Sequence, residues 1–202
     1  GDRLLGVLAR AQDHDATGDF ALAVEVNLTA AFHLSRLVAP GMIERRGGSI
    51  VNISSIAAMQ GVPFAAAYCA SKGGVRSLTK SVAVHCREKK NGVRCNSVHP
   101  DGVKTPMVVK VATGRDDASR AEIEAIARHS TRFCEPEDIA GVVLFLVSDE
   151  SRHVNGAEIM VDGRKVLDAP GKHIEKVKAG KHVFACEPGP GPQGYTTKVR
   201  AP

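Results

Sequence analysis

Tyr68 and Lys72 lie four residues apart in a stretch with helical periodicity, so both side chains fall on one face of a helix. The strand-like run SIVNISS ends at Ser55, thirteen residues before Tyr68. A phenol has an ordinary pKa of about 10, and a nearby ammonium group favours its ionised form. Such a set could exchange a proton with an alcohol or a ketone while the serine hydroxyl holds the substrate oxygen.

Amphipathic helical patterns alternate with short β-branched runs up to residue 163. The pattern predicts helices over 18–46, 66–90, 107–131 and 135–149, and strands over 49–55, 92–98 and 157–163. This alternation is typical of an α/β fold with a largely parallel sheet. In open sheets of that kind ligands bind outside the carboxyl ends of the strands, which is where Ser55 is expected.

The charge distribution divides the chain into two parts. It has 202 residues, 43% of them apolar, and a formal net charge of +5. Residues 1–163 hold 19 Lys and Arg against 19 Asp and Glu, so the excess of 8 − 3 = 5 lies in residues 164–202. We therefore expect one folded domain over 1–163 and a flexible, basic, Gly- and Pro-rich tail. Binding of the tail to an anionic surface is an alternative, but nucleic acid is not an expected partner.

Other functional classes lack their usual sequence features. No run approaches the roughly 18 apolar residues of a membrane helix and no signal peptide is evident, so we expect a cytoplasmic protein with no membrane segment. Five scattered cysteines without a CxxC pair predict reduced thiols. His85, His99 and His129 have no metal-ligand partner at a useful spacing, so no metal site is expected and all three are interpreted as structural or exposed.

Longer motifs surround the tyrosine and resemble the short-chain dehydrogenase/reductase family over about residues 18–163. In chain order they are VNLTAAF, VNISS, YCASK, RCNSVHPDGVKTPM, EPEDIAGVVLFLVSDE and GAEIMVDG. The resemblance implies a Rossmann-like doubly wound parallel sheet, of which this chain holds the C-terminal, catalytic half. The family patterns TGxxxGxG and NNAG do not occur in the chain. Three βα units, roughly 90 residues, are therefore expected to be lacking, which leaves the inner edge of the sheet bare.

The resemblance also implies a role for each candidate residue. Tyr68 matches the catalytic acid/base, and Lys72 its electrostatic partner, which also holds the nicotinamide ribose hydroxyls. Ser55 matches the residue that orients the substrate oxygen. Asn27 matches an asparagine at a helix distortion, where a bound water connects Lys72 to solvent; with Tyr68 and Lys72 it belongs to the cofactor side of the site. The loop that touches the nicotinamide carboxamide and the phosphates contributes Pro100, Val103 and Thr105.

The implied activity is NAD(P)-dependent interconversion of a secondary alcohol and a ketone by hydride transfer. The motifs look most like those of bacterial hydroxysteroid and cyclic-alcohol dehydrogenases, which slightly favours NAD over NADP. Relatives pair through the helices that match 18–46 and 66–90, so a homo-oligomer, dimer or tetramer, is expected. The alternative is a truncated, non-catalytic remnant or pseudoenzyme that serves as an interaction module.

Overall fold

The computed structural model describes residues 16–62, 65–113, 115, 117–128, 133–162, 183–188 and 195–200. The chain divides into two compact units, Gly1–Gly163 and Arg164–Pro202, and this division coincides with the boundary drawn from the charge distribution. The second unit contains two antiparallel strands, β6 (Val183–Pro188) and β7 (Tyr195–Arg200). These two strands were not predicted for the tail, which was expected to be flexible.

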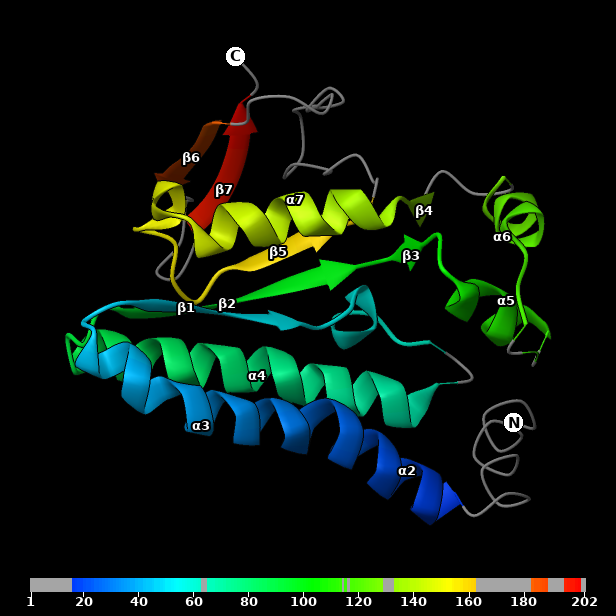
Figure 1. Ribbon diagram of the computed structural model, residues 1–202, viewed down its shortest axis with the longest axis horizontal. Helices are drawn as coiled ribbons and strands as arrows, with labels where there is room; N and C mark the ends of the chain where they lie inside the picture. Colours follow the sequence, from blue (N-terminus) through cyan, green and yellow to red (C-terminus); the bar gives the residue numbers. More distant parts are fainter. Residues whose placement is uncertain are drawn as a thin grey trace. The chain divides into compact units, whose positions relative to one another are not determined.

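A three-stranded parallel sheet forms the centre of the first unit (Figure 1). Its strand order is β1 (Gly48–Ile53), β2 (Val93–Pro100) and β5 (Glu158–Val161). Ile50 lies opposite Cys95 in the register of β1 and β2. Within the described residues, β1 pairs only with β2 and forms an edge of the sheet. The expected α/β fold with a parallel sheet is confirmed.

Helices cover both faces of this sheet. Helices α3 (Ala30–Glu44) and α4 (Ala66–Glu88) lie on one face, and α7 (Pro136–Val147) lies on the other (Figure 1). Between α4 and the sheet the buried core consists of Ile50, Ala83, Cys86, Val93 and Cys95. Burying a large aliphatic side chain stabilises a fold by about 1.5–3 kcal/mol, so this core attaches α4 firmly to the strands. The doubly wound layering agrees with the predicted architecture.

The first helix is continuous but not uniform. It consists of α2 (Ala16–Val24), a π-helical segment η1 (Glu25–Thr29) and α3. Asn27 is the central residue of η1. Single π-helical turns inside α-helices occur frequently at functional sites. The helix distortion at Asn27 that the family resemblance implies is therefore present.

The same helix bears on the expectation that the chain has no membrane segment. The segment Phe20–Glu44 is long and apolar enough to cross a membrane by length and composition alone, with a mean hydropathy of 1.2. The segment contains no uninterrupted apolar run of that length, because a few widely spaced charged residues interrupt it. A helix of a soluble protein can meet the same criterion.

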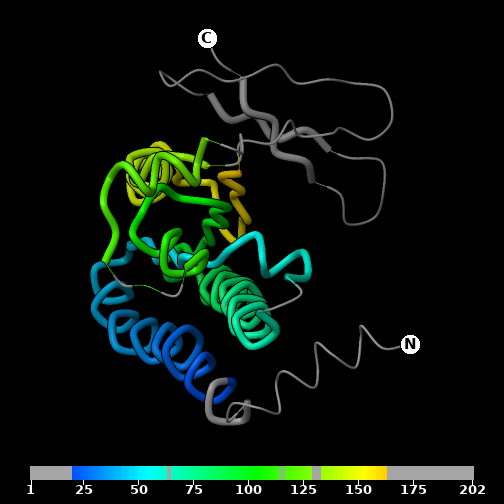
Figure 2. Tube along the Cα trace, turned by 90° about the vertical axis from the view of Figure 1, so that its right-hand side faces the viewer, coloured from blue at the N-terminus to red at the C-terminus, as the bar shows by residue number. Residues whose placement is uncertain are grey.

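The helical stretch expected over 107–131 forms two short helices beyond the carboxyl end of β2. They are α5 (Pro106–Thr113) and α6 (Arg120–Ala127), and Figure 2 looks onto the end of the sheet where they lie. Strands β3 (Gly102–Val103) and β4 (Phe133–Cys134) pair in parallel on either side of them in the sequence. This pairing closes the segment into a loop whose two ends are fixed.

Charged side chains hold this loop. Lys104 Nζ lies 2.6 Å from a carboxylate oxygen of Glu135 and 3.1 Å from one of Glu124. These hydrogen bonds raise the pKa of Lys104. Hydrogen bonds from the backbone and hydroxyl of Ser119, which caps α6, lower the pKa of Glu122 to about 2. Lys104 thus connects the start of this loop to α6 and to the start of α7.

Candidate active site

The carboxyl ends of β1 and β2 and the first turns of α4 meet at one edge of the sheet (Figures 1 and 2). Tyr68 and Lys72 lie in those turns, and the Lys72 ammonium is 5.7 Å from the centroid of the Tyr68 ring. Tyr68 is 37% exposed, so the phenol can be reached from solvent. The two residues that carry the sequence hypothesis therefore lie next to each other at the edge where ligands bind in folds of this kind.

Lys72 also contacts the end of the neighbouring strand. Its Nζ donates a hydrogen bond of 3.0 Å to the carbonyl oxygen of Ile53. Burial lowers the pKa of the Lys72 ammonium, because removal from water penalises the charged form. The cation also lies within the range of a cation–π contact with the Tyr68 ring. The lysine thus joins β1 to the start of α4.

Ser55 follows β1 and is buried. It caps the short 3-10 helix η2 (Ile56–Ala58), and its Oγ accepts a hydrogen bond of 3.1 Å from the backbone N–H of Ala57. The same Oγ lies 3.5 Å from the carbonyl oxygen of Pro100, at the end of β2. The predicted strand over 49–55 therefore ends two residues early, at Ile53, because the Ser55 side chain caps η2 instead.

Asn27 acts on Tyr68 through another side chain. Its Nδ2 donates to Ser71 Oγ at 3.2 Å, and Ser71 Oγ donates to the carbonyl oxygen of Tyr68 at 2.8 Å. Gly74 allows the π-helical segment to pack this closely, because a Cβ there would lie 2.5 Å from a methyl carbon of Leu28. The helix distortion and the first turn of α4 are thus connected.

The three loop residues of the sequence hypothesis lie next to this edge. Pro100 ends β2, Val103 belongs to β3, and Thr105 Oγ1 donates to the carbonyl oxygen of Val103 at 3.3 Å. Lys104 between them is held by its carboxylate partners. Of the three, Pro100 is the one in contact with Ser55, through its carbonyl oxygen.

His99 is a contact of the site that the sequence analysis does not assign. The imidazole is fully buried, and its Nδ1 lies 3.0 Å from the carbonyl oxygen of Ser55. The interpretation of His99 as structural is correct but incomplete. Residues two apart in a strand share a face, so the sequence alone could have predicted that His99 and Ser97 of β2 lie side by side. His85 is exposed, and His129 lies outside the described residues.

An apolar groove of about 390 Å³ runs between α3 and the free edge of β1. One side of it is a helical row with a spacing of four residues, made of Val26, Ala30, Leu34, Val38 and Met42. Asn27 and Lys72 line the groove as well, so it reaches the candidate site from the side. Within the described residues the edge of β1 is bare, as expected from the resemblance.

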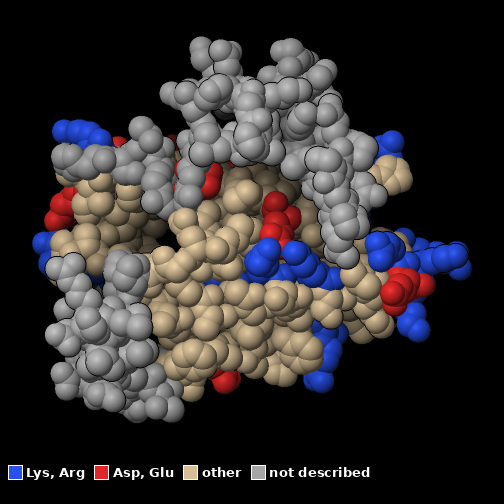
Figure 3. Space-filling view, turned by 180° about the vertical axis from the view of Figure 1, so that it is seen from behind, with Lys and Arg blue, Asp and Glu red and all other residues tan. Residues whose placement is uncertain are grey.

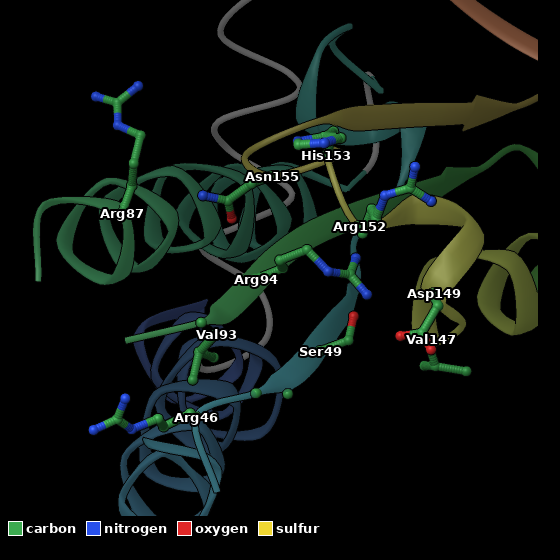
Figure 4. Close-up of a pocket in the computed structure, with 13 residues that line it drawn as sticks. Arg46, Ser49, Arg87, Val93, Arg94, Val147, Asp149, Arg152, His153 and Asn155 are labelled. Carbon is green, nitrogen blue, oxygen red and sulfur yellow. The ribbon is translucent and has the colours of Figure 1, made fainter. Parts of the chain in front are cut away.

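A larger cavity of about 590 Å³ lies at the opposite ends of β1 and β2 (Figure 4). Arg46, Arg87, Arg94 and Arg152 line it, but Arg46 and Arg87 extend away from Arg94. The Arg94 guanidinium donates to the carbonyl oxygens of Leu146, Ser148 and Val154 and to the Ser151 hydroxyl. Arg94 therefore caps the end of α7, and its guanidinium is occupied by these contacts.

Cysteine and metal chemistry have little support in the described part of the chain. Cys69, Cys86, Cys95 and Cys134 are free thiols, and burial raises the pKa of Cys95 to about 12. The side chain of Cys186 lies outside the described residues. No group of three or more His, Cys, Asp or Glu residues that could hold a metal ion occurs among the residues described.

Comparisons with known proteins agree with this geometry. A family model described as enoyl-(acyl carrier protein) reductase matches residues 7–163. The chain is 37% identical over 160 residues to 2-(S)-hydroxypropyl-CoM dehydrogenase 3 of Xanthobacter autotrophicus, covering 78% of this chain and 62% of that protein. It is also 37% identical over 140 residues to cyclohexanol dehydrogenase of an Acinetobacter species, covering 69% and 52% of the two chains.

Solved structures show the same relationship. A gluconate 5-dehydrogenase from Burkholderia cenocepacia, in complex with NADP and tartrate, superimposes with a TM-score of 0.59 at 32% identity. That match covers 72% of this chain and 55% of the other. The chain thus spans between about half and three fifths of the length of these proteins, 52–62% of the two curated relatives and 55% of the solved structure.

Proposed function

Because this chain belongs to the short-chain dehydrogenase/reductase family, we propose that it forms the catalytic half of an NAD(P)-dependent oxidoreductase that interconverts a secondary alcohol and a ketone. The observation that carries this proposal is the placement of Tyr68 and Lys72, whose ring and ammonium are 5.7 Å apart at the carboxyl edge of a parallel sheet. Ser55, the third group that this chemistry needs, follows the neighbouring strand.

In the proposed reaction the Tyr68 hydroxyl exchanges one proton with the substrate oxygen. It gives the proton to the oxygen when a ketone is reduced and takes it back when an alcohol is oxidised. The exposure of the ring supports this role, because a substrate must reach the phenol. The Ser55 hydroxyl holds the same substrate oxygen, and such orientation reduces the entropy lost on reaching the reactive geometry.

Lys72 places a positive charge 5.7 Å from the centroid of the Tyr68 ring. Asn27 fixes the turn that carries Tyr68 through Ser71, and it lines the same groove as Lys72. Water held between Asn27 and Lys72, which both line this groove, could carry a proton to and from the Lys72 amine. We propose this water-filled route beside Asn27 as the path by which protons pass between Lys72 and solvent.

The residues present fit the nicotinamide end of a dinucleotide. Tyr68 and Lys72 offer a hydroxyl and an ammonium for ribose hydroxyls, and the loop of Pro100, Val103 and Thr105 offers backbone groups for the carboxamide and phosphates. When bound, the nicotinamide supplies or accepts the hydride. The family's phosphate-binding pattern TGxxxGxG does not occur in this sequence, so binding of the adenine and pyrophosphate is assigned to no residue of this chain.

For the substrate we propose a small or cyclic secondary alcohol and the corresponding ketone. The similarity to cyclohexanol dehydrogenase supports this class. For the cofactor, the sequence similarity favours NAD, whereas the similar gluconate 5-dehydrogenase was solved with NADP. We therefore propose NAD or NADP, to be distinguished by parallel assays with both.

We further propose that the protein is a homo-oligomer that pairs through α2, α3 and α4. Large apolar side chains are exposed along this first helix: Phe20, Leu22, Val26, Phe32, Leu34, Leu37, Val38 and Ile43. Seen from behind, the helical layer below the sheet is mostly uncharged, and basic side chains gather at the side where α3 and α4 end (Figure 3). Large apolar side chains exposed in a row along one helix are typical of protein interfaces.

Two measurements test these proposals on the protein expressed from its complete reading frame. Change in nicotinamide absorbance is followed with NAD and NADP and a panel of cyclic and linear secondary alcohols; the proposal expects turnover with at least one pair, and no turnover with any would reject it. Light scattering after gel filtration tests assembly. We expect a dimer or tetramer that Leu37→Glu shifts toward monomer, and a monomeric wild type would reject the interface.

A further inference from the structure

His99, at the end of β2, is held between two partners. It is 0% exposed, its Nδ1 lies 3.0 Å from the carbonyl oxygen of Ser55, and its Nε2 lies 2.8 Å from Ser97 Oγ. A carbonyl oxygen only accepts hydrogen bonds, so Nδ1 must carry the proton. In the neutral ring Nε2 then accepts from the Ser97 hydroxyl. Both ring nitrogens are therefore satisfied in one tautomer.

The surroundings of the ring favour this neutral form. Burial lowers the pKa of His99, and this effect is the largest of those acting on it. The hydrogen bond to Ser55 and the negative charge of Glu158 on β5 act in the opposite direction, while Arg76 and Lys80 on α4 again lower the pKa. Glu158 forms ion pairs with both cations, at 2.8 Å from Arg76 and 2.5 Å from Lys80. The cluster therefore has one more positive than negative charge, which adds to the effect of burial in favouring the neutral imidazole.

The imidazole of His99 contacts the carbonyl group of Ser55, which is one of the two groups of this residue held by hydrogen bonds. The Ser55 carbonyl accepts from His99 and also from the backbone N–H of Ala58 at 3.0 Å. The Ser55 hydroxyl in turn accepts from the N–H of Ala57 at 3.1 Å. The peptide group and the hydroxyl are thus fixed from opposite ends of one residue. Without the imidazole N–H, the Ser55 carbonyl would keep the N–H of Ala58 as its hydrogen-bond donor, and the Ser55 hydroxyl would keep its contact with the Pro100 carbonyl at 3.5 Å.

We propose that His99 is a positioning residue for Ser55, whose hydroxyl it holds in the orientation that receives the substrate oxygen. The catalytic role of this positioning rests on the proposed function, whereas the hydrogen bond from His99 to Ser55 is a property of the fold. His99 touches no reacting atom and acts through the Ser55 peptide alone.

The test is amide hydrogen exchange of Ala57 and Ala58, measured by NMR relative to the core amides of β2. The Ala57 N–H reports on the Ser55 hydroxyl and the Ala58 N–H on the Ser55 carbonyl. His99→Phe retains a ring of similar size but removes the donor, so we expect exchange at these two amides to rise about tenfold relative to β2. His99→Asn places an amide N–H near the position of Nδ1 and should restore most of the protection.

Thr79→Val is the matched control. Thr79 is also fully buried between β1 and α4, and its hydroxyl accepts from Asn52 and donates to the carbonyl oxygen of Val75. The substitution removes a buried polar contact away from Ser55, so exchange at Ala57 and Ala58 relative to β2 should not change. Expressing exchange as a ratio removes the effect of a uniform loss of stability, which would raise all three rates together.

Kinetics provide the second readout. In His99→Phe we expect kcat per folded enzyme to fall about tenfold, with partial recovery in His99→Asn and no change in Thr79→Val. If His99→Phe leaves the exchange ratio unchanged, or if Thr79→Val raises it equally, the positioning role is overturned. If the exchange ratio changes as expected but the wild type turns over no alcohol or ketone, the positioning role holds and the proposed function fails.

Discussion

Lys72 Nζ donates a 3.0 Å hydrogen bond to the carbonyl oxygen of Ile53, the last residue of β1. The next residue, Ser54, directs its N–H to Val98 of β2. Since successive residues of a strand direct their backbone groups to opposite sides, the Ile53 carbonyl points to the free edge of the sheet. The ammonium group is therefore fixed by a strand end as well as by its neighbour Tyr68, which explains how a long, flexible side chain has one position.

The two lysines of this end of the molecule should titrate at different pH values. Burial lowers the pKa of Lys72, whereas the hydrogen bonds that Lys104 donates to Glu135 and Glu124 raise the pKa of Lys104. Lysines labelled by reductive 13C-methylation and followed by NMR against pH should show Lys72 losing its proton first. Lys72→Arg and Lys104→Arg assign the two signals. Titration of Lys104 at the lower pH would contradict the geometry of both sites.

Two adjacent glycines of α4 test the packing that holds Asn27. A Cβ at Gly74 would lie 2.5 Å from Leu28 of η1, whereas a Cβ at Gly73 would meet nothing within 4 Å. Gly74→Ala should therefore lower the free energy of unfolding by about 1–3 kcal/mol through overpacking. Gly73→Ala should raise it by about 0.5–1 kcal/mol, because alanine is the better helix former.

Urea unfolding of the two variants provides the comparison. The substitutions are chemically identical and one residue apart, so differences in helix propensity cancel between them. Equal effects of the two substitutions would show that η1 does not pack on α4 in this way.

The dependence of stability on pH should carry a contribution from His99. Its pKa is below 6.5 in the folded state because the ring is buried, while in the unfolded chain it returns to about 6.5. Below that pH the unfolded state binds a proton that the folded state does not. The contribution of His99 is thus present above pH of about 6.5 and is lost as the pH falls, by up to about 1.4 kcal/mol per unit.

The measurement is the free energy of unfolding between pH of about 7.5 and 5.5, the range in which histidine titrates, for the wild type and His99→Phe. The variant lacks the titrating group, so its stability should depend less steeply on pH. Other groups, including Glu158 with its lowered pKa, are common to both proteins. The same slope in both would show that His99 accepts a proton as readily in the folded state as in the unfolded chain.

Local patterns in the sequence predict much of this fold. Helices expected over 66–90 and 135–149 match α4 and α7 closely, because each combines a continuous apolar stripe with recognisable ends. The strand boundary at Ser55 is less accurate, since the capping of η2 by its side chain depends on the adjoining turn. The sequence pattern over 107–131 is polar and helical throughout, so it does not predict that this stretch divides into α5 and α6.

Contacts between distant segments were less accessible from the sequence. The Asn27–Ser71–Tyr68 connection and the contact of His99 with Ser55 join residues 44 positions apart. Such pairs follow from the layering of η1, α4 and the sheet, and no local spacing records them. The candidate residues could be found because their types and motifs were distinctive, but the groups that position them required the fold.

The most direct test of the account compares the only two tyrosines of the chain. Nicotinamide-dependent turnover is measured for the wild type, Tyr68→Phe and Tyr195→Phe, each expressed from the complete reading frame. Removing the acid/base of Tyr68 should lower kcat by about 10²–10⁴-fold and leave the melting temperature nearly unchanged, since the phenol is partly exposed. Tyr195→Phe should retain activity. Wild-type activity that survives in Tyr68→Phe would contradict the central claim.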